Sequence, residues 1–403
     1  MKGLINWLDI RFPLLTTWKT QVSEYYVPKN LNFLYFFGSL ALVVLVMQFV
    51  TGLWLTMFYT ATAEQAFNSI EYIMRDVNYG WLLRYMHSTG ASAFFIIIYF
   101  HLFKAILYGS YQKPRELVWI LGMALFILSI AEAFCGYLLP WGQMSYWGAQ
   151  VVTSLFSAIP YVGDNLVIWL RGDYNVANAT LQRFFAFHVI AIPFLLSLMI
   201  FLHIVALRKV GSNNPEGIEI SKYLDNEGKP LDGLPFHPYF TIKDFFGILV
   251  FLFIFFGVVF FFPEMGGVFL ENDNFSPANS LVTPEHIAPV WYLTPFYAIL
   301  RAIPDKILGV IAMSSAILIL LFLPWLDKSP VRSMRYKGVF SRYALAFFVI
   351  CFFSLGYLGM VDMTPLNLFL ARLCTLIYFA YFLLMPIYSR YEVHRIPPER
   401  IKR

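Results

Sequence analysis

Four histidines lie in apolar stretches of the sequence, where an ionisable side chain is costly and usually has a function. His87 and His101 are 14 residues apart in one stretch, and His188 and His203 are 15 apart in another. On an α-helix both spacings complete about four turns, so each pair shares a face at two levels about 21 Å apart. Because imidazole binds transition metals well, this pattern indicates metal-centred cofactors at two depths.

The composition predicts that these stretches cross a membrane. Only 13% of the 403 residues are charged, against about 25% in soluble domains, and 59% are hydrophobic. A bilayer crossing needs about 20 mostly apolar residues. The sequence predicts eight such helices, at residues 33–58, 79–106, 116–138, 182–207, 243–262, 306–326, 342–361 and 365–386. We therefore expect an all-α polytopic membrane protein.

The basic residues predict how the chain is oriented. Of the 29 lysine and arginine residues, 22 lie in the terminal segments, in alternate loops or at the adjoining helix ends. The positive-inside rule then places both termini in the cytoplasm, which requires an even number of spans. Residues 1–30 mix charged and aromatic side chains without an apolar core, so we expect a membrane-surface segment and not a signal peptide.

In this topology the second and fourth spans run in the same direction, so His87 lies level with His188 and His101 with His203. Each level receives one imidazole from each of two helices, as in bis-histidine ligation of haem. Histidines that only pack against their neighbours would not need matched spacings on two helices. A zinc site needs its ligands clustered around one ion, which two levels about 21 Å apart do not provide. We expect an N-terminal four-helix bundle (residues 1–210) that holds two haems, and a C-terminal transmembrane domain (residues 211–403).

Glycines repeat the two-level pattern on the other two helices of the predicted bundle. Gly38 and Gly52 are 14 residues apart in the first span, and so are Gly122 and Gly136 in the third. A missing side chain would let a flat porphyrin lie against the helix backbone. Close packing of helices is the alternative use of such small residues. The chain has three cysteines and no C-x-x-C-H motif, so the haems are expected to be of the non-covalent b type.

Basic residues flank the four histidines on the sides nearer the membrane surfaces. They are Arg84, Lys104, Arg183 and Arg208, each three or five residues from a histidine. Haem propionates are anionic and would point toward the surfaces, where these side chains could pair with them. Ordinary snorkelling at helix ends would give the same placement.

Five longer segments extend the argument. They read RDVNYGW (75–81), RYMH (84–87), GYLLPWGQM (136–144), RFFAFH (183–188) and GSNNP (211–215). With them the sequence resembles the cytochrome b family of quinol–cytochrome c reductases over nearly its whole length. The resemblance implies a low-potential outer haem on His87 and His188, and a high-potential inner haem on His101 and His203. It also implies a bacterial inner membrane as the location.

The resemblance implies quinol oxidation near the outer haem, at a motif that usually reads Pro-Glu-Trp-Tyr. Here the motif reads PVWY, so the glutamate proposed to accept a proton is missing. Another carboxylate of the same loop could replace it. Glu285 lies nearest in sequence, with Glu264 and Glu271 as alternatives. The positions implied for this site are Tyr137, Glu285, Pro289, Val290, Trp291, Tyr292 and Tyr297.

The resemblance also implies quinone reduction at the inner side. The polar residues expected there are Ser39, Arg208, Ser212, Asn213, Lys243 and Asp244. The family often has histidine where this chain has Arg208. Because arginine cannot deliver a proton near neutral pH, Lys243 and Asp244 are the better proton donors.

The implied function is a Q cycle. Quinol at the outer site would send one electron to a Rieske iron–sulfur protein and one through the two haems to quinone. Three scattered cysteines cannot build a Rieske centre, so partner subunits must supply it and a c-type cytochrome. Family members form homodimeric complexes in the lipid bilayer, and nothing indicates nucleic acid as a partner.

Two other functions fit part of the pattern. A secondary transporter would carry intramembrane charges in inverted repeats, but it would be colourless and would leave the paired histidines unexplained. A di-haem anchor of a quinone-linked dehydrogenase would have haems. It would not need the two long aromatic loops predicted at residues 139–181 and 263–305, and co-purifying subunits would distinguish it.

Overall fold

The structure is a computed structural model that describes residues 2–401. Eight helical segments in it are long and apolar enough to cross a membrane. They are Phe33–Thr56, Gly80–Tyr108, Glu116–Leu138, Asn178–Val210, Tyr239–Phe261, Lys306–Leu326, Val339–Met360 and Pro365–Leu383. These segments confirm all eight predicted spans, with ends that differ by at most four residues from those read off the sequence.

The spans contain ten of the labelled helices. These are α3 (Phe37–Thr56), α5 (Gly80–Tyr108), α6 (Glu116–Leu138), α9 (Asn178–Ala186), α10 (Ile192–Val210), α11 (Tyr239–Phe261), α13 (Lys306–Leu318), α14 (Leu323–Leu326), α15 (Val339–Met360) and α16 (Pro365–Leu383). The shorter helices lie between the spans or near the chain ends. They are α1 (Lys2–Arg11), α2 (Leu14–Trp18), α4 (Ala66–Arg75), α7 (Gln143–Leu155), α8 (Gly163–Arg171), α12 (Thr294–Ala302) and α17 (Met385–Tyr391).

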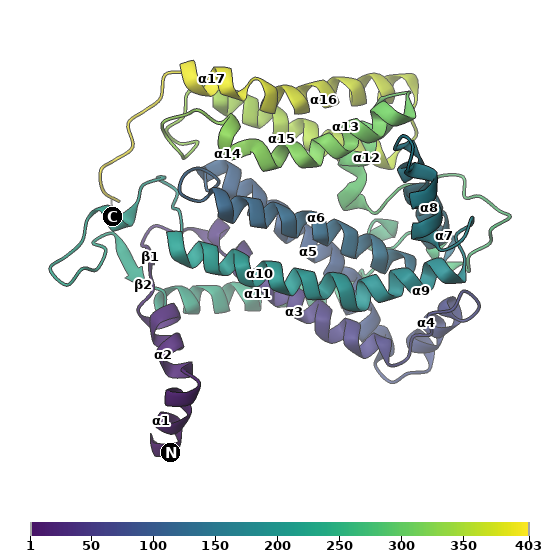
Figure 1. Cartoon of the computed structure of the whole chain (residues 1–403), viewed down its shortest axis with the longest axis horizontal. Helices are drawn as coiled ribbons and strands as arrows, with labels where there is room; N and C mark the ends of the chain where they lie inside the picture. The colour runs from purple at the N-terminus through teal and green to yellow at the C-terminus, as the bar shows by residue number, and fades with distance from the viewer. Residues whose placement is uncertain (1, 402–403) are drawn as a thin grey trace.

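The helices form two groups that lie along each other (Figure 1). In the first group α3 packs on α5 and α6 packs on α10, which gives the four predicted bundle helices. In the second, α15 packs on α16 and on α12. Helix α11 follows the bundle in sequence but packs against α5 and α3. In space it therefore extends the first group.

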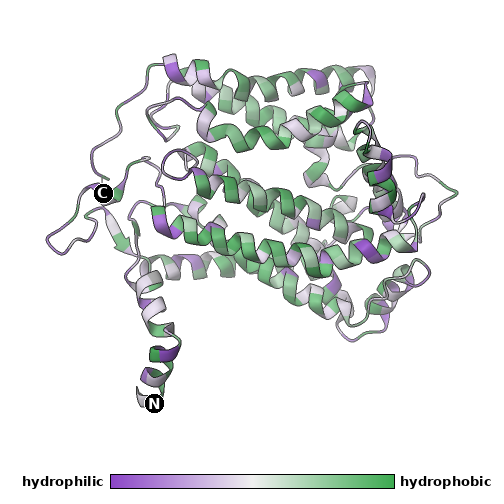
Figure 2. Ribbon diagram, in the orientation of Figure 1, coloured by the Kyte–Doolittle hydropathy of each residue, from purple (hydrophilic) through white to green (hydrophobic). Residues whose placement is uncertain are grey.

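Polar and apolar residues separate along the long direction of the molecule. The spans are apolar over most of their length, and polar residues gather toward the two ends (Figure 2). The C-terminus and a short hairpin lie at one end, where the N-terminal helices also project, and α4, α7 and α8 lie at the other (Figure 1). The hairpin pairs β1 (Tyr26–Pro28) antiparallel to β2 (Gly233–Pro235). Because the N-terminal helices and the C-terminus lie at the same end of the molecule, the number of spans is even, as predicted.

The fourth span is not a regular α-helix. Between α9 and α10, residues Phe187–Ala191 form one turn of π-helix, and Pro193 follows in the first turn of α10. A π turn accommodates one residue more than an α turn, and such turns occur often at functional sites. The sequence pattern predicted a continuous α-helix here and gave no sign of the π turn.

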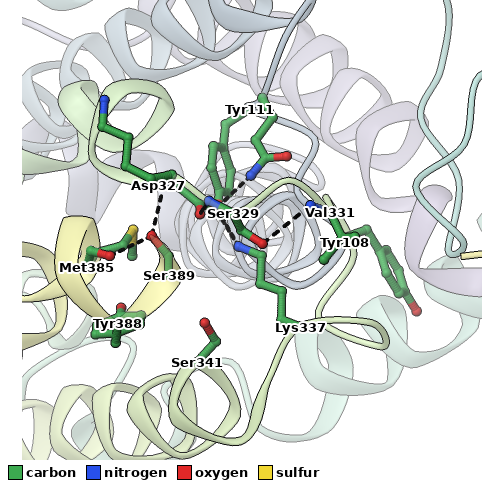
Figure 3. Close-up of polar contacts among 12 residues, drawn as sticks. Tyr108, Tyr111, Asp327, Ser329, Val331, Lys337, Ser341, Met385, Tyr388 and Ser389 are labelled. Carbon is green, nitrogen blue, oxygen red and sulfur yellow. Dashed lines mark hydrogen bonds and ion pairs between the residues drawn. The ribbon is translucent and has the colours of Figure 1, made fainter. Parts of the chain in front are cut away.

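At the end that holds the C-terminus, which we call the inner end after the predicted topology, a buried ion pair fixes the loop that follows α14. Asp327 accepts hydrogen bonds from Tyr111 Oη at 2.5 Å and from Gln112 Nε2 at 2.7 Å, and it pairs with the Lys337 ammonium (Figure 3). Burial opposes ionisation of Asp327, but the ammonium of Lys337 holds the pKa of that carboxyl below its ordinary value. The contact ties α5 to the C-terminal helices.

At the outer end, the two long loops are joined to each other. Gly142, which begins the turn into α7, forms a β-bridge with Pro277. The Ser145 backbone N–H donates to Asn274 Oδ1 at 2.9 Å. A Cβ on Gly142 would lie 2.4 Å from the Asn274 carbonyl oxygen, so only glycine allows this approach. The loops predicted at residues 139–181 and 263–305 thus form one ordered outer layer.

Candidate functional site

The outer histidine pair has the spacing of two ligands of one metal ion. The ring centroids of His87 and His188 are 6.1 Å apart, and the ring planes are nearly perpendicular at 88°. Imidazole nitrogens bind a metal at about 2.0 Å, so two rings that share an ion have centroids roughly 6 Å apart. In residues 2–401 there is no group of three or more His, Cys, Asp or Glu side chains that could hold a metal. This geometry fits axial ligation and excludes a zinc-type cluster in that range.

Hydrogen bonds leave one nitrogen of each outer histidine free for a metal. The Thr51 hydroxyl donates to the Met47 carbonyl at 2.7 Å, so it accepts from Nδ1–H of His87, 2.9 Å away. His188 Nδ1 lies 3.0 Å from Glu132 Oε1 and 3.1 Å from the Glu132 carbonyl oxygen. Both partners are acceptors, so Nδ1 carries the proton in each ring. Nε2 then remains as the ligating atom.

The predicted glycines of the outer level each face one of these two rings. A Cβ on Gly52 would lie 3.0 Å from His87 Cε1, and one on Gly136 would lie 2.5 Å from His188 Cε1. Real Cβ atoms essentially never approach another atom within 3.0 Å. The glycines therefore make room for the ring edges.

The inner level repeats this arrangement. A Cβ on Gly38 would lie 3.2 Å from His101 Cε1, and one on Gly122 would lie 3.3 Å from His203 Cε1. His101 Nδ1 is buried without a hydrogen-bond partner among the described residues. The four glycines and four histidines thus pair one to one on four helices, which fits two flat groups held between imidazoles.

The π turn explains the unequal histidine spacings. His188 lies inside the π segment Phe187–Ala191, whereas α5 is continuous from His87 to His101. The π turn absorbs one residue, so 15 residues of the fourth span cover the same four turns as 14 residues of α5. Both spans therefore present their histidines at matching depths.

Three of the four flanking basic residues have side-chain groups that could still bind an anion. Neither Arg84 nor Lys104 forms an ion pair with a carboxylate anywhere in residues 2–401, although Lys104 is only 9% exposed and lies 4.6 Å from the Tyr35 ring. A buried unpaired cation is costly and fits an anionic partner such as a haem propionate. Arg183 instead donates to the Trp169 carbonyl. Arg208 lies over the Tyr25 ring at 4.0 Å, but its Nη1 is buried without a hydrogen-bond partner in residues 2–401.

Of the three acids considered for the quinol-oxidation site, Glu271 is the one with a hydrogen bond to an expected site residue in residues 2–401. The Tyr137 hydroxyl donates to Glu271 Oε2 at 2.9 Å. Burial raises the pKa of Glu271 to about 7, although the hydrogen bond from Tyr137 acts in the opposite direction. Glu285, the first choice from sequence, is exposed. The preference for Glu285 is therefore not supported, because closeness in the loop sequence does not bring its side chain to the aromatic residues.

The PVWY segment is held by aromatic and polar contacts. Val290 is buried. The Trp291 ring packs on the ring of Phe269, with centroids 6.3 Å apart, and Phe269 lies two residues before Glu271 in the sequence. Trp291 Nε1 donates to Ser92 Oγ at 3.1 Å. The Tyr292 carbonyl accepts from Tyr99. These contacts bring the loop of Glu271 and the PVWY segment to α5.

Tyr297 and Pro289 complete the outer residues expected from sequence. The Tyr297 hydroxyl donates to the Ile287 carbonyl at 3.1 Å, and the Arg301 guanidinium lies 5.3 Å from its ring. Pro289 is half-buried beside Val290. Tyr297 therefore braces the segment that leads into PVWY, which is a structural role in addition to any contact with quinol.

At the inner side, the structure joins two of the predicted residues directly. The Ser39 hydroxyl donates to Asp244 Oδ2 at 2.7 Å, which connects the start of α3 with the start of α11. The neighbouring Lys243 ammonium lies 5.1 Å from the Phe240 ring. Asp244 is therefore the acid that faces the bundle helices.

Asn213 and Ser212 are placed differently. Asn213 is 3% exposed, and its Nδ2 donates to the Tyr108 carbonyl at 2.7 Å, at the end of α5. Its amide nitrogen therefore holds the loop between α10 and α11 against the end of α5. Ser212 is half-buried beside it. The hydrogen bond occupies Nδ2, whereas Oδ1 is buried without a partner among the described residues, so the expected contact of Asn213 with quinone would fall to Oδ1.

Comparison with known families decides the relationship. A family model described as cytochrome b/b6/petB matches residues 22–211, and one described as cytochrome b (C-terminal)/b6/petD matches residues 277–379. The chain belongs to the cytochrome b family. It is therefore a multi-span membrane subunit of a quinol–cytochrome c reductase, an oxidoreductase, and its family binds haem b.

Relatives cover nearly the whole cytochrome b chain. It is 57% identical to a cytochrome b of Allochromatium vinosum, over 98% of each protein. It is 46% identical to a protein of Bradyrhizobium diazoefficiens named cytochrome b/c1, covering 98% of this chain but 56% of that one. A solved structure titled hyperthermophilic respiratory Complex III aligns with a TM-score of 0.89 at 40% identity, over 96% of this chain and 99% of that one. The match indicates a multi-subunit respiratory complex.

Two polar residues of this cytochrome b escaped the sequence analysis. Thr51 is one residue before Gly52, and Glu132 is one helical turn before Gly136. Glu132 did carry a usable signal, because an acid inside an apolar span is a functional hypothesis by default. Thr51 carried none, since threonine is common in transmembrane helices.

Proposed function

We propose that this cytochrome b binds two haems and couples quinol oxidation at the outer side to quinone reduction at the inner side, in a Q cycle. The observation that carries the proposal is the one-to-one pairing of four glycines with four histidines at two levels. Bound haem would supply one-electron transfer, with His87 and His188 as outer ligands and His101 and His203 as inner ligands. Arg84 and Lys104 would bind propionates.

At the outer site, oxidation of one quinol releases two electrons and two protons. We propose Glu271 as an acceptor of one of these protons, because its carboxylate lies against Tyr137 and near the PVWY segment. A pKa of about 7 suits a group that takes up a proton and then releases it to water near neutral pH. Trp291, Tyr292 and the apolar Val290 would enclose the quinol ring.

At the inner site, quinone gains two electrons and two protons. We propose that Asp244 passes protons to the quinone and that Ser39 holds its carboxylate in place, as their hydrogen bond at 2.7 Å allows. Lys243 is beside Asp244 and could supply a positive charge to the reduced quinone. Arg208 lies against aromatic rings and would orient quinone or a propionate without transferring a proton.

The partners follow from what the chain lacks. Its three cysteines lie apart along the sequence and are buried, so an iron–sulfur centre must come from another subunit. We propose a Rieske protein and a c-type cytochrome, and the relative named cytochrome b/c1 supports the latter. We further propose a homodimeric complex in the bacterial inner membrane with both termini in the cytoplasm, in line with the excess of basic residues on that side.

We also propose that the chain divides into a haem-binding bundle of residues 1–210 and a second transmembrane domain of residues 211–403. Helix α11 of the second domain packs on α3 and α5 of the bundle. Asp244 lies in the second turn of α11 and Ser39 in the first turn of α3, and their hydrogen bond crosses this contact. We therefore propose that quinone is reduced where the two domains meet.

A potentiometric titration of the haem absorbance of the isolated complex tests the proposal. We expect two b-type components with well-separated midpoint potentials. Replacing His188 by leucine should remove one component and replacing His101 by leucine the other. A single component in the unmodified complex would contradict the two-level arrangement.

A further inference from the structure

The four predicted haem ligands do not have equivalent surroundings. His188 Nδ1 is within hydrogen-bond distance of a carboxylate, His87 Nδ1 donates to the Thr51 hydroxyl, and His101 Nδ1 has no partner among the described residues. His203 Nδ1 likewise has no partner there, so His188 is the one ligand of the four with a carboxylate at Nδ1 in residues 2–401. The difference lies in the residues behind the histidines and is independent of the spacing that identified them.

Glu132 is placed to act on His188 in two ways. Its backbone carbonyl and its carboxylate both lie near the same ring nitrogen, at 3.1 Å and 3.0 Å. The side chains are 19% exposed for Glu132 and 17% for His188. The second carboxylate oxygen, Oε2, is buried and has no hydrogen-bond partner in residues 2–401. In the absence of a bound group, a carboxylate placed this way in an apolar span lowers the stability of the chain. A cationic group beside His188, such as ferric haem, would offset that cost.

A carboxylate behind a ligating imidazole has a known physical consequence. It fixes the ring orientation and draws the Nδ1 proton toward itself, which makes Nε2 a stronger electron donor. A stronger donor stabilises oxidised iron more than reduced iron and so lowers the reduction potential. An imidazole without such an acceptor, such as His101, leaves the potential higher.

We propose that Glu132 is a positioning residue that orients His188 and lowers the reduction potential of the outer haem below that of the inner haem. The inference rests on the proposed ligation of the outer haem by His87 and His188. Its effect is directional, because an electron on a low-potential outer haem moves readily to a higher-potential inner haem. Glu132 would thereby help drive electrons toward the quinone-reduction side.

The test compares variants of the whole complex by potentiometric titration and by the EPR spectrum of the ferric haems. E132Q and E132A remove the carboxylate but keep the backbone carbonyl, so the outer haem should stay bound. Its midpoint potential should shift upward and its highest g-value should change, while the inner component stays in place. E132D, which keeps a carboxylate, should remain closer to the unmodified complex. E116Q, at the inner end of the same helix, is the matched control and should move neither component.

Three results would overturn the proposal. One is an unchanged outer potential in both E132Q and E132A. Another is an equal shift in E116Q. The third is loss of the outer haem from all three Glu132 variants, which would make the side chain a packing requirement. Loss from E132Q and E132A with retention in E132D would support the proposal, since it would show that a carboxylate holds the ligand. A single b-type component in the unmodified complex would instead contradict the two-haem function.

Discussion

At the scale of single residues, the four glycines that face the histidines are not equally tight. A Cβ on Gly136 would lie 2.5 Å from His188 Cε1, whereas one on Gly122 would lie 3.3 Å from His203 Cε1. A methyl group at Gly122 needs a shift of a few tenths of an ångström, but one at Gly136 must displace the ring. G136A should therefore remove or strongly shift the outer haem component, and G122A should shift the inner one slightly. Redox titration of both variants measures this, and equal effects would contradict the geometry.

If Glu271 accepts a proton from quinol, the turnover rate should depend on the ionisation of Glu271 and therefore on pH. Glu271 can accept a proton only when it is ionised, and burial raises its pKa to about 7. The rate should therefore fall as the pH drops through about 7. E271Q should lower the rate about 100-fold, a usual size for loss of proton transfer, and abolish that dependence. Y137F removes a hydrogen bond that lowers the Glu271 pKa, so it should move the fall to higher pH.

The control for this prediction is E285Q, because Glu285 is exposed. Its rate and pH profile should match the unmodified complex. A pH-dependent loss in E285Q with a normal E271Q would return the role to the acid first favoured from sequence.

These residues also show what sequence reasoning could reach. The histidines and glycines could be found because regular helix geometry converts spacing into position. The choice between Glu271 and Glu285 could not be made, since both lie in an irregular loop whose path depends on contacts such as Phe269 with Trp291. The hydrogen bond that Asn213 makes could not be foreseen for the same reason. Its amide closes a loop onto α5, a contact between segments far apart in sequence.

At the scale of elements, the eight spans were predictable because bilayer thickness fixes their length and composition. The π turn was not, because one inserted residue leaves the apolar pattern unchanged. It predicts that the fourth span tolerates a deletion that α5 does not. Removing the exposed Ile190 from the π segment would leave a 14-residue spacing, as in α5. Both haem components should then survive.

The matched control is deletion of the partly exposed Ile96, between His87 and His101 in the regular helix α5. Removing one residue from an α-helix turns the two sides by about 100° relative to each other. One histidine then leaves the ligand face, and at least one haem component should disappear from the absorbance spectrum. Survival of both components in this variant, or loss in the Ile190 deletion, would show that the π turn does not compensate the spacing.

At the scale of the whole molecule, three inner loops meet at one acid. Glu219 accepts from Arg115 Nη1 at 2.7 Å and also pairs with Arg332, so the loops after α5, α10 and α14 are joined. Burial opposes ionisation of Glu219, but the two guanidinium groups lower its pKa below the ordinary value. Its stabilising contribution is therefore present above that ordinary value and is lost as the pH falls below it. Charge patterning placed these loops on one side, but it could not show which charges meet.

Removing this acid should loosen the assembly of the two helix groups. E219Q leaves the Arg115 side chain, 2% exposed, without its carboxylate. Breaking a buried pair from one side costs about 3 kcal/mol or more, whereas an exposed pair contributes under about 1 kcal/mol. Scanning calorimetry of the solubilised complex should therefore give a midpoint several degrees lower for E219Q. E227Q, which removes the exposed partner of Lys229, should leave it unchanged. In residues 2–401 Glu219 pairs with Arg115 and Arg332 and with none of the four histidines. The b-type potentials of E219Q should therefore match those of the unmodified complex, and a shift in either would mean that the inner loops also control the haems.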